Sequence, residues 1–170
     1  MAGPTLRTAL SLVLEDARPA LEPVRARFDP ASVEAGVPLH VTLLFPFVER
    51  SSISEAELEA LFAVQWPLEF SLVHLAEFPG IVYAVPEPDD RLVALMRSVH
   101  AKFPEVPPYG GEVDGVTPHA TLGRNVELRE VGAVCASLLP IACRVDSVSL
   151  LAEREPDRWV ELRRFRLGTS

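Results

Sequence analysis

The chain has 170 residues, of which 48% are hydrophobic and 24% are charged, and its formal net charge is -8 at neutral pH. This length and hydrophobic content fit one globular domain with a sizeable core. The acidic balance disfavours a protein that grips long stretches of nucleic acid, because such proteins pair many Lys and Arg residues with phosphates. A small phosphate ligand, or the end of one strand, stays compatible, since a few local cations suffice there.

The cysteines Cys135 and Cys143 form no Cys-x-x-Cys pair and have no histidine near them in sequence. The sequence therefore predicts neither a disulfide scaffold nor a zinc knuckle, while one disulfide stays open. Residues 1–7 lack the charged segment and apolar run of a signal peptide, and the apolar runs are too short to span a bilayer. We therefore expect a soluble, cytoplasmic protein with no membrane partner.

The first elements are expected to alternate between strand and helix. A buried strand is expected over residues 5–14 and a helix over residues 15–28, although Pro23 inside that helix removes a hydrogen bond. The turn-forming residues from 29 to 38 predict a loop, and residues 39–45 are a strong strand candidate.

A helix and a hairpin are expected next. Ser54 followed by Glu57 is a capping box, and the apolar spacing after it predicts a helix over residues 54–64. Residues 67–76 and 80–85 predict two strands joined in a hairpin by a Pro-Gly turn.

The second part of the chain follows a clear amphipathic helix at residues 89–102. The loop after it, residues 103–117, is rich in Pro and Gly, and loops of this length in compact domains are often functional. A strand is expected at residues 118–122. One more helix is then expected at residues 127–138. A final hairpin is expected from strands at residues 141–151 and 159–167, which are separated by a charged turn at residues 153–157.

The two halves run through the same order of elements. Each contains a strand, a helix and a hairpin, and the strands that begin the two series carry the same His-x-Thr motif. This repeated order predicts a duplicated unit. The mixture of strands, helices and hairpins indicates an α+β fold with antiparallel sheets.

The repeated motifs are His40-Val41-Thr42 and His119-Ala120-Thr121. Because side chains alternate between the two faces of a strand, the histidine and threonine of each motif share one face. The residue between them joins apolar neighbours on the other face. Each strand therefore presents two polar groups side by side and anchors them through its opposite face.

Two such strands can place two imidazoles across one cleft. Histidine gives or takes a proton near neutral pH, and opening a cyclic phosphate needs both roles at once. One imidazole takes a proton from the attacking water or hydroxyl, and the other protonates the departing ribose oxygen. The threonine hydroxyls can donate hydrogen bonds to the nonbridging phosphate oxygens.

One His-x-Thr alone predicts little, because a lone histidine is usually a satisfied structural residue. The pair predicts more, since both copies lie in expected strands, follow proline-containing turns and precede leucine. The other histidines, His74 and His100, lack this context. We interpret both as structural, with His100 near a helix C-terminus, where a cation is favourable.

Residues 38–47 (PLHVTLLFPF) and 118–124 (PHATLGR) resemble the paired signatures of the 2H phosphoesterases. The branch with the most similar pattern is the bacterial 2'-5' RNA ligase-like proteins, which are RNA 2',3'-cyclic phosphodiesterases. The resemblance covers essentially the whole chain. It implies a single domain, residues 1–170, with two intertwined, pseudo-symmetric lobes around a central groove, helices outside, and one motif facing the groove from each lobe.

The resemblance also implies an activity, a cyclic phosphodiesterase with no metal and no cofactor. Its substrates would be 2',3'-cyclic phosphates of small nucleotides or RNA ends, with no long nucleic acid bound and a monomer expected. His40 and His119 would be the acid–base pair, in either order, and Thr42 and Thr121 the phosphate ligands. The reverse reaction, 2'-5' RNA ligation, stays open because it uses the same chemistry with a ribose hydroxyl in place of water.

Arg124 matches a position that often carries a phosphate-binding arginine in relatives, with a surface ion pair as the alternative. Strict alternation would place its charge on the apolar face, where it is costly. Gly123 just before it offers a β-bulge that re-aims the side chain.

Several other residues are candidates for the groove. Tyr109, in the Pro/Gly loop, is a candidate to stack on a base, or else packs against the domain. Phe45 is the equivalent of Arg124 in the first motif and is expected in the core, with stacking on a base as the alternative. Arg163, Arg164 and Arg166 are expected on a solvated strand face, with a place along the groove as the alternative.

Two other functions stay open. A non-catalytic module would use the groove to bind nucleotides or RNA ends, but intact histidines in both motifs argue against it. A metal site on His40 and His119 would lack the carboxylate or thiol ligands that zinc usually takes, and threonine is an unusual ligand.

Overall fold

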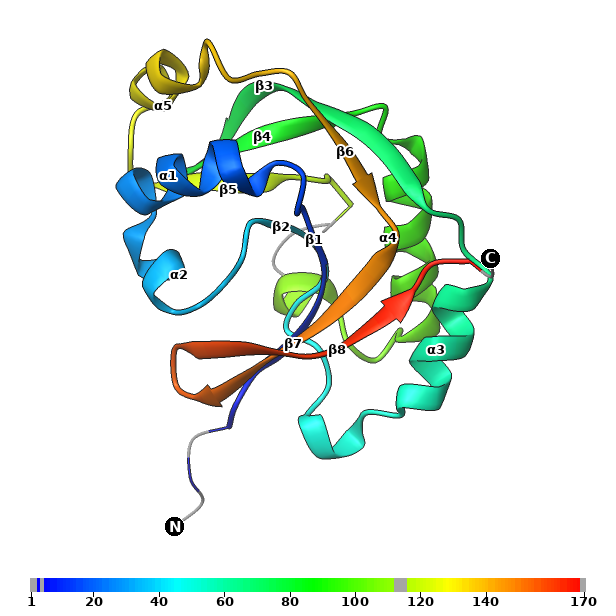
Figure 1. Ribbon diagram of the computed structural model, residues 1–170. Coiled ribbons are helices and arrows are strands. Elements are labelled where there is room, and N and C mark those ends of the chain that lie inside the picture. Colours follow the sequence, from blue (N-terminus) through cyan, green and yellow to red (C-terminus); the bar gives the residue numbers. More distant parts are fainter. Residues whose placement is uncertain (1–2, 4, 112–115, 169–170) are drawn as a thin grey trace.

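The computed structural model describes residues 3, 5–111 and 116–168, and within them the strands form two four-stranded antiparallel sheets (Figure 1). The first sheet consists, in spatial order, of β2 (His40–Leu44), β1 (Thr8–Val13), β7 (Ser147–Glu155) and β8 (Arg158–Arg166). The second consists of β5 (Ala120–Arg124), β4 (Ile81–Glu87), β3 (Leu68–Phe78) and β6 (Ile141–Val145). The motif strands β2 and β5 are edge strands of different sheets, and they lie beside each other.

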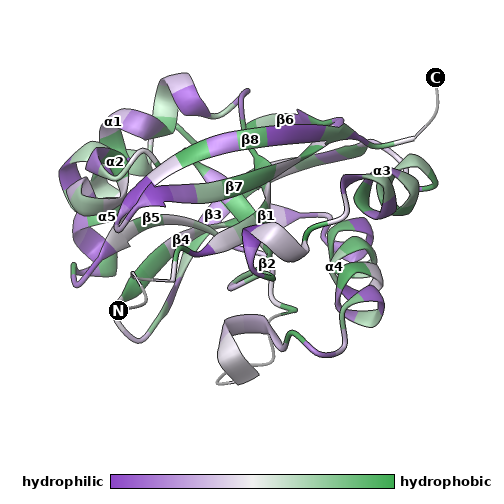
Figure 2. Ribbon diagram, turned by 90° about the horizontal axis from the view of Figure 1, so that it is seen from below, coloured by the Kyte–Doolittle hydropathy of each residue, from purple (hydrophilic) through white to green (hydrophobic). Residues whose placement is uncertain are grey.

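The helices lie on opposite sides of the sheets (Figures 1 and 2). On one side, α1 packs on β5 and α5 packs on β3, while on the other α4 packs on β2 and α3 packs on β8. Their bounds, with the short α2 beside α1, are α1 Arg18–Phe28, α2 Pro30–Glu34, α3 Glu55–Ala63, α4 Asp90–Lys102 and α5 Leu128–Cys135.

The two halves of the chain repeat one arrangement. The unit β1-α1-β2 in the first sheet matches β4-α4-β5 in the second, and each ends in a motif strand at a sheet edge. Moreover, α1 follows a strand of the first sheet but packs on β5 of the second, and α4 does the reverse on β2. The expected α+β fold, with antiparallel sheets and helices outside, is confirmed.

The alternation predicted for the motif strands is also confirmed. Val41, Leu43, Ala120 and Leu122 are at most 1% exposed and belong to the hydrophobic core. The helices α3 and α4 are amphipathic, since hydrophobic (green) and hydrophilic (purple) residues alternate along them in Figure 2. At the start of α3, the backbone N–H of Glu57 donates to the Ser54 hydroxyl at 3.3 Å, as the capping box predicts.

The strand expected over residues 141–151 is wrong, because this segment forms two strands in different sheets. β6 pairs with β3, and after Asp146 the chain enters β7, which pairs with β1 and β8. Both segments are similarly apolar, so local pattern does not reveal the change of partner. The expected turn at residues 153–157 is also too long, since β7 continues to Glu155 and β8 begins at Arg158.

The loop expected over residues 29–38 is interrupted by the helix α2. Its proline, Pro30, occupies the first turn, where the missing N–H costs nothing and the fixed φ favours a helix. The preceding helix α1 begins at Arg18 rather than at residue 15, and it accommodates Pro23 in its interior.

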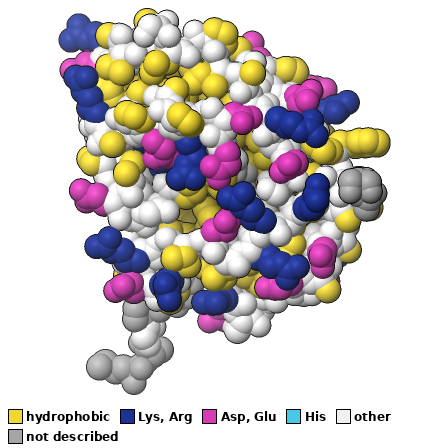
Figure 3. All heavy atoms as spheres, in the orientation of Figure 1, with side chains coloured by type: hydrophobic (Ala, Val, Ile, Leu, Met, Phe, Trp, Pro, Cys, Tyr) yellow, Lys and Arg dark blue, Asp and Glu magenta, His cyan; other side chains and the backbone are white. Residues whose placement is uncertain are grey.

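On the face in Figure 3, Lys and Arg side chains are interspersed with Asp and Glu, so no continuous positive strip crosses it. In the part of the chain that is described, no helix is both long and apolar enough to span a membrane. Cys135 and Cys143 are buried free thiols.

Candidate active site

A pocket of about 900 Å³ receives both His-x-Thr motifs. His40 and Thr42 enter it from β2, and His119 and Thr121 enter it from the start of β5. The structure thus brings together the four motif residues, which are separated in sequence but lie on neighbouring edge strands.

Each motif histidine is held by the backbone in the same way. Nδ1 of His40 lies 2.7 Å from the carbonyl oxygen of Pro38, and Nδ1 of His119 lies 2.8 Å from that of Thr117. Because a carbonyl oxygen only accepts hydrogen bonds, both Nδ1 atoms carry the proton. In the neutral rings, Nε2 is therefore the nitrogen that can take a proton.

Both imidazoles favour the neutral form. Burial, together with the nearby charges of Arg25 and Arg124, lowers the pKa of His40 from 6.5 to about 4, against the opposing hydrogen bond to Pro38. Burial also lowers the pKa of His119, and the charge of Arg124 acts in the same direction. Both imidazoles are therefore neutral at neutral pH and can act as bases, and the pKa of His40 is lowered more than that of His119.

Thr42 hydrogen-bonds to His40 of the same motif. Its hydroxyl lies 3.1 Å from Nε2 of His40. Since Nε2 of neutral His40 can only accept, Thr42 donates to it. A phosphate oxygen that accepts from Thr42 would compete for this single proton and release Nε2.

Tyr109, from the Pro/Gly loop, lines the pocket. Its backbone N–H donates to the Phe45 carbonyl at 2.6 Å, and its φ of 51° lies in the left-handed region, which is unusual for a bulky residue. Such conformations cost energy and persist where the surroundings enforce them. Its ring lines the pocket and lies 6.4 Å from the His119 ring.

The surroundings of the two histidines differ. The ring of His119 makes edge contacts with Phe78 at 5.1 Å and Tyr83 at 5.5 Å between centroids. On the other side of the pocket, His40 lies near the charge of Arg25, which helps to lower its pKa. One imidazole is thus packed among aromatic rings, and the other sits in a charged environment.

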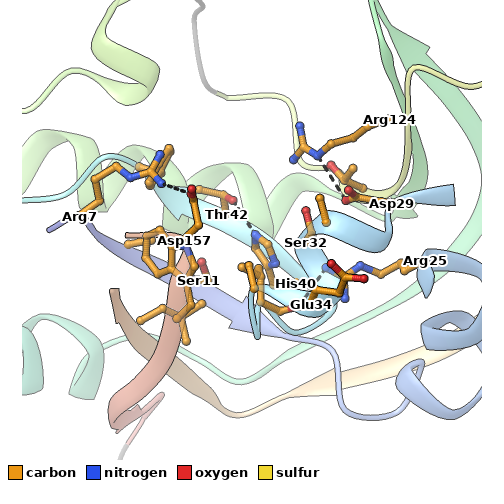
Figure 4. A pocket seen from close by; sticks show the side chains of 18 of the residues that line it. Arg7, Ser11, Arg25, Asp29, Ser32, Glu34, His40, Thr42, Arg124 and Asp157 are labelled. Carbon is orange, nitrogen blue, oxygen red and sulfur yellow. Dashed lines mark hydrogen bonds and ion pairs between the residues drawn. The ribbon is translucent and has the colours of Figure 1, made fainter. Parts of the chain in front are cut away.

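Arg124 lines the pocket, and it also forms an ion pair, which the sequence offered as the alternative to a phosphate contact. Its Nε donates to the buried carboxylate of Asp29 at 3.2 Å (Figure 4). Among the described residues, its two Nη atoms have no hydrogen-bond partner, and the side chain is half exposed. The guanidinium is therefore oriented by Asp29 and keeps two nitrogens available to an anion in the pocket.

The position of Arg124 follows a β-bulge, as expected from Gly123. The register between β4 and β5 shifts at Leu122, since Val82 pairs with Gly123 but Tyr83 pairs with Thr121. A Cβ on Gly123 would lie 2.6 Å from Cγ2 of Val126 and 3.2 Å from Cβ of Phe28. The glycine is thus required by close packing beneath the bulge.

Gly123→Ala is therefore expected to destabilise the protein by about 1–3 kcal/mol, the usual cost of overpacking a core. Urea unfolding measures the change. Gly132→Ala is the matched control, because among the described residues nothing beyond its chain neighbours and the backbone of α5 lies within 4 Å of its added Cβ, and alanine is favoured inside a helix. Equal stabilities of the two variants would contradict the packing role of Gly123.

Sequence reasoning missed two buried polar residues that line the pocket. Arg25 is 2% exposed and Ser11 is 0% exposed, and within the described residues Nε of the first and Oγ of the second have no hydrogen-bond partner. Ser11 sits opposite Thr42 in the register of β1 and β2. Their spacing in sequence carried no motif, so only the fold reveals them.

The expectation that Phe45 is a core residue is wrong. It is half-buried and lines the pocket, because the chain leaves β2 at Leu44 and alternation no longer decides which way the next side chain points. Its ring lies 6.5 Å from Tyr109 and 6.0 Å from Trp159, a pocket residue that sequence reasoning also missed.

The remaining candidates lie outside the pocket. His100 hydrogen-bonds to the Leu43 carbonyl at 2.9 Å, and His74 is an exposed residue 3.9 Å from Glu87. The C-terminal arginines lie on the outer surface, where Arg163 pairs with Glu55 and Arg164 with Glu15. Nowhere in residues 3, 5–111 and 116–168 do three His, Cys, Asp or Glu side chains group as metal ligands.

One family model and several solved structures match this chain. The family model described as the 2'-5' RNA ligase superfamily matches residues 13–157. E. coli LigT complexed with 3'-AMP superposes with a TM-score of 0.67 at 20% identity, covering 96% of this chain and 98% of that one. TT0787 of Thermus thermophilus gives 0.64 at 19% identity, covering 96% and 100%. A structure described as a phosphoesterase gives 0.65 at 19%, covering 98% and 100%. No curated protein sequence matches the chain.

Proposed function

The chain belongs to the 2'-5' RNA ligase superfamily, and on this premise we propose that it is a metal-independent phosphodiesterase that opens 2',3'-cyclic phosphates of nucleotides or RNA ends. The observation that carries the proposal is the meeting of His40 and His119 in one pocket, each with its Nδ1–H held by a backbone carbonyl. This arrangement presents two Nε2 atoms for proton transfer and matches the needs of in-line phosphoryl chemistry.

In the proposed reaction, water attacks phosphorus and gives its proton to one neutral imidazole. The bond from phosphorus to one ribose oxygen breaks, and the other histidine, as imidazolium, donates a proton to that oxygen. Thr42 and Thr121 donate hydrogen bonds to the nonbridging oxygens, and Arg124 holds the negative charge. When the hydroxyl of a second ribose attacks phosphorus in place of water, the same groups serve 2'-5' ligation.

The different surroundings of the histidines favour one assignment. His40 has its pKa lowered to about 4 and lies near the charge of Arg25, so it stays neutral over the wider pH range and serves as the base. His119 then serves as the acid, and the negative charge of a bound phosphate favours its protonation.

Similar proteins provide indirect support. Structures of E. coli LigT are described with 3'-AMP, ATP, NADP+ and phosphate. These ligands share a phosphate group, and most share a nucleoside. A nucleotide with a terminal phosphate is therefore the substrate class that we propose for the pocket between β2 and β5.

The proposed acid–base pair predicts an acidic optimum for kcat/KM. The acid limb appears as pH falls and His40 is protonated, with a pKa of about 4. The basic limb appears as pH rises through the pKa of His119, which lies below the ordinary value of 6.5. A pH–rate profile of kcat/KM should therefore peak between about 4 and 6.5, and a maximum on the basic side of this range would contradict the assignment.

Phosphorus NMR tests the function directly. The protein is incubated with a 2',3'-cyclic nucleotide and with a short RNA that ends in a 2',3'-cyclic phosphate, with and without EDTA. We expect conversion to a phosphate monoester at a rate that EDTA leaves unchanged, and the 2'- or 3'-monoester identifies the broken bond. No conversion of either substrate would favour a nucleotide-binding module, and loss of turnover in EDTA would show that a metal takes part.

A further inference from the structure

The pocket extends well beyond the motif residues. In Figure 4, Arg7 and Asp157 lie at one end, Arg124 and Asp29 lie at the other, and His40 and Thr42 lie between them. The end near Arg124 serves the phosphate in the proposed function. The end near Arg7 has no role in that chemistry, although it is part of the same pocket.

A row of rings leads from His119 toward this second end. The Tyr109 ring lies 6.4 Å from His119 and 6.5 Å from Phe45, and the Phe45 ring lies 6.0 Å from Trp159. The guanidinium carbon of Arg7 lies 5.7 Å from the Phe45 centroid and 5.6 Å from that of Trp159. Flat groups therefore line this end, and such surfaces stack nucleobases regardless of their identity.

The charges at this end favour a base over a phosphate. Arg7 donates to Glu153 at 2.6 Å and to Asp157 at 3.1 Å, so its positive charge is opposed by two carboxylates. The hydrogen bonds from Arg7 hold the pKa of Glu153 at about 2, so this carboxylate is ionised. Because the Arg7 charge is already paired with two carboxylates, its guanidinium favours stacking on a neutral aromatic ring over binding a second phosphate.

The stacking surface is held in place before any ligand binds. The backbone N–H of Trp159 donates to the Ala35 carbonyl at 2.8 Å, and Arg158 donates to the Glu34 carbonyl at 3.1 Å. The segment at Gly36 packs closely against Trp159, since a Cβ added to Gly36 would lie 2.8 Å from the Trp159 carbonyl oxygen. A surface that needs no ordering on binding contributes more of its contact energy to affinity.

We propose that Arg7, Phe45 and Trp159 form a subsite for a second nucleobase, that of the nucleotide adjoining the one with the cyclic phosphate. In this row of rings, Tyr109 lies next to His119 and Trp159 lies farther away. Tyr109 therefore faces the base of the nucleotide with the cyclic phosphate, and Trp159 is left for the base of the adjoining nucleotide. The preferred substrate is then an RNA end of two or more nucleotides rather than a mononucleotide. This inference rests on the proposed phosphodiesterase function.

The test compares kcat/KM for a 2',3'-cyclic mononucleotide with that for a dinucleotide ending in the same cyclic nucleotide. Wild type is expected to prefer the dinucleotide, and Trp159→Ala to lower this preference by about 5- to 150-fold, the usual range for one stacked base. Trp159→Phe, which keeps a flat ring, should restore most of it. Trp66→Ala is the matched control, because Trp66 is 76% exposed and lies outside this pocket, and it should keep the wild-type preference.

The outcomes separate the two proposals. If wild type opens neither substrate, the phosphodiesterase function is wrong. If it opens both equally well, or if Trp159→Ala lowers both rates by the same factor, only the second-base subsite is wrong. As a readout independent of turnover, a dinucleotide 3'-phosphate should change Trp159 fluorescence in a Trp66→Phe background, and a mononucleotide should change it much less.

Discussion

Replacing either His40 or His119 by alanine is expected to lower kcat for cyclic phosphate opening about 10²- to 10⁴-fold, the usual contribution of one positioned proton-transfer group. Each imidazole is oriented by a backbone carbonyl, at Pro38 and at Thr117, so neither replaces the other in position. Single-turnover kinetics with a 2',3'-cyclic nucleotide measure the loss at the chemical step.

The double variant should lose little more than the slower single variant, because the two histidines act in one concerted transfer. His74→Ala is the matched control, since His74 is an exposed residue outside the pocket. Thermal unfolding checks that each variant is folded. A folded His119→Ala protein with wild-type kcat would contradict the acid–base pair, and the same holds for His40→Ala.

Arg25→Met is expected to destabilise the protein by about 2–4 kcal/mol, because it leaves the hydrogen-bond acceptors of the buried guanidinium without their donor. Arg25 is 2% exposed and donates to Glu22 at 2.8 Å and to the Val37 carbonyl at 3.0 Å. Glu22 in turn accepts from the backbone N–H of Leu39 at 2.8 Å. These bonds fasten the chain just before His40 to α1, so loss of Arg25 should also lower kcat.

Urea unfolding at constant pH measures the stability change. Arg27→Met is the matched control, because Arg27 lies on the same helix with an exposed side chain, and it should stay within about 0.5 kcal/mol of wild type. Since the Arg25 charge contributes to the low pKa of His40, the acid limb of the pH–rate profile should move toward higher pH in Arg25→Met. Equal stability of the two variants would contradict a fastening role for Arg25.

Part of the site follows directly from local pattern. The period of two along β2 and β5 places His40 with Thr42 and His119 with Thr121, and burial of Val41 and Ala120 on the other face confirms it. The bulge expected from Gly123 lies at the neighbouring Leu122. Local rules succeed here because they depend only on residues within a few positions of each other.

The pattern fails where a residue leaves its strand or a segment changes partner. Phe45 stands just beyond β2 and turns to the pocket rather than the core. The apolar run from residue 141 divides at Asp146 because β6 pairs with β3 and β7 with β1. In both places the outcome depends on contacts with strands that are distant in sequence. Alternation within one segment carries no information about these contacts.

The fold class and the two motif strands follow from the sequence alone, since hydrophobic periodicity and residue chemistry are local properties. The other residues of the site are known only from the three-dimensional fold. Arg7 meets Glu153 across 146 positions, and Arg124 meets Asp29 across 95. The first pair forms because β1 and β7 are neighbours in one sheet, and the second because α1 packs on β5. The spacing of charges along the chain does not predict either contact.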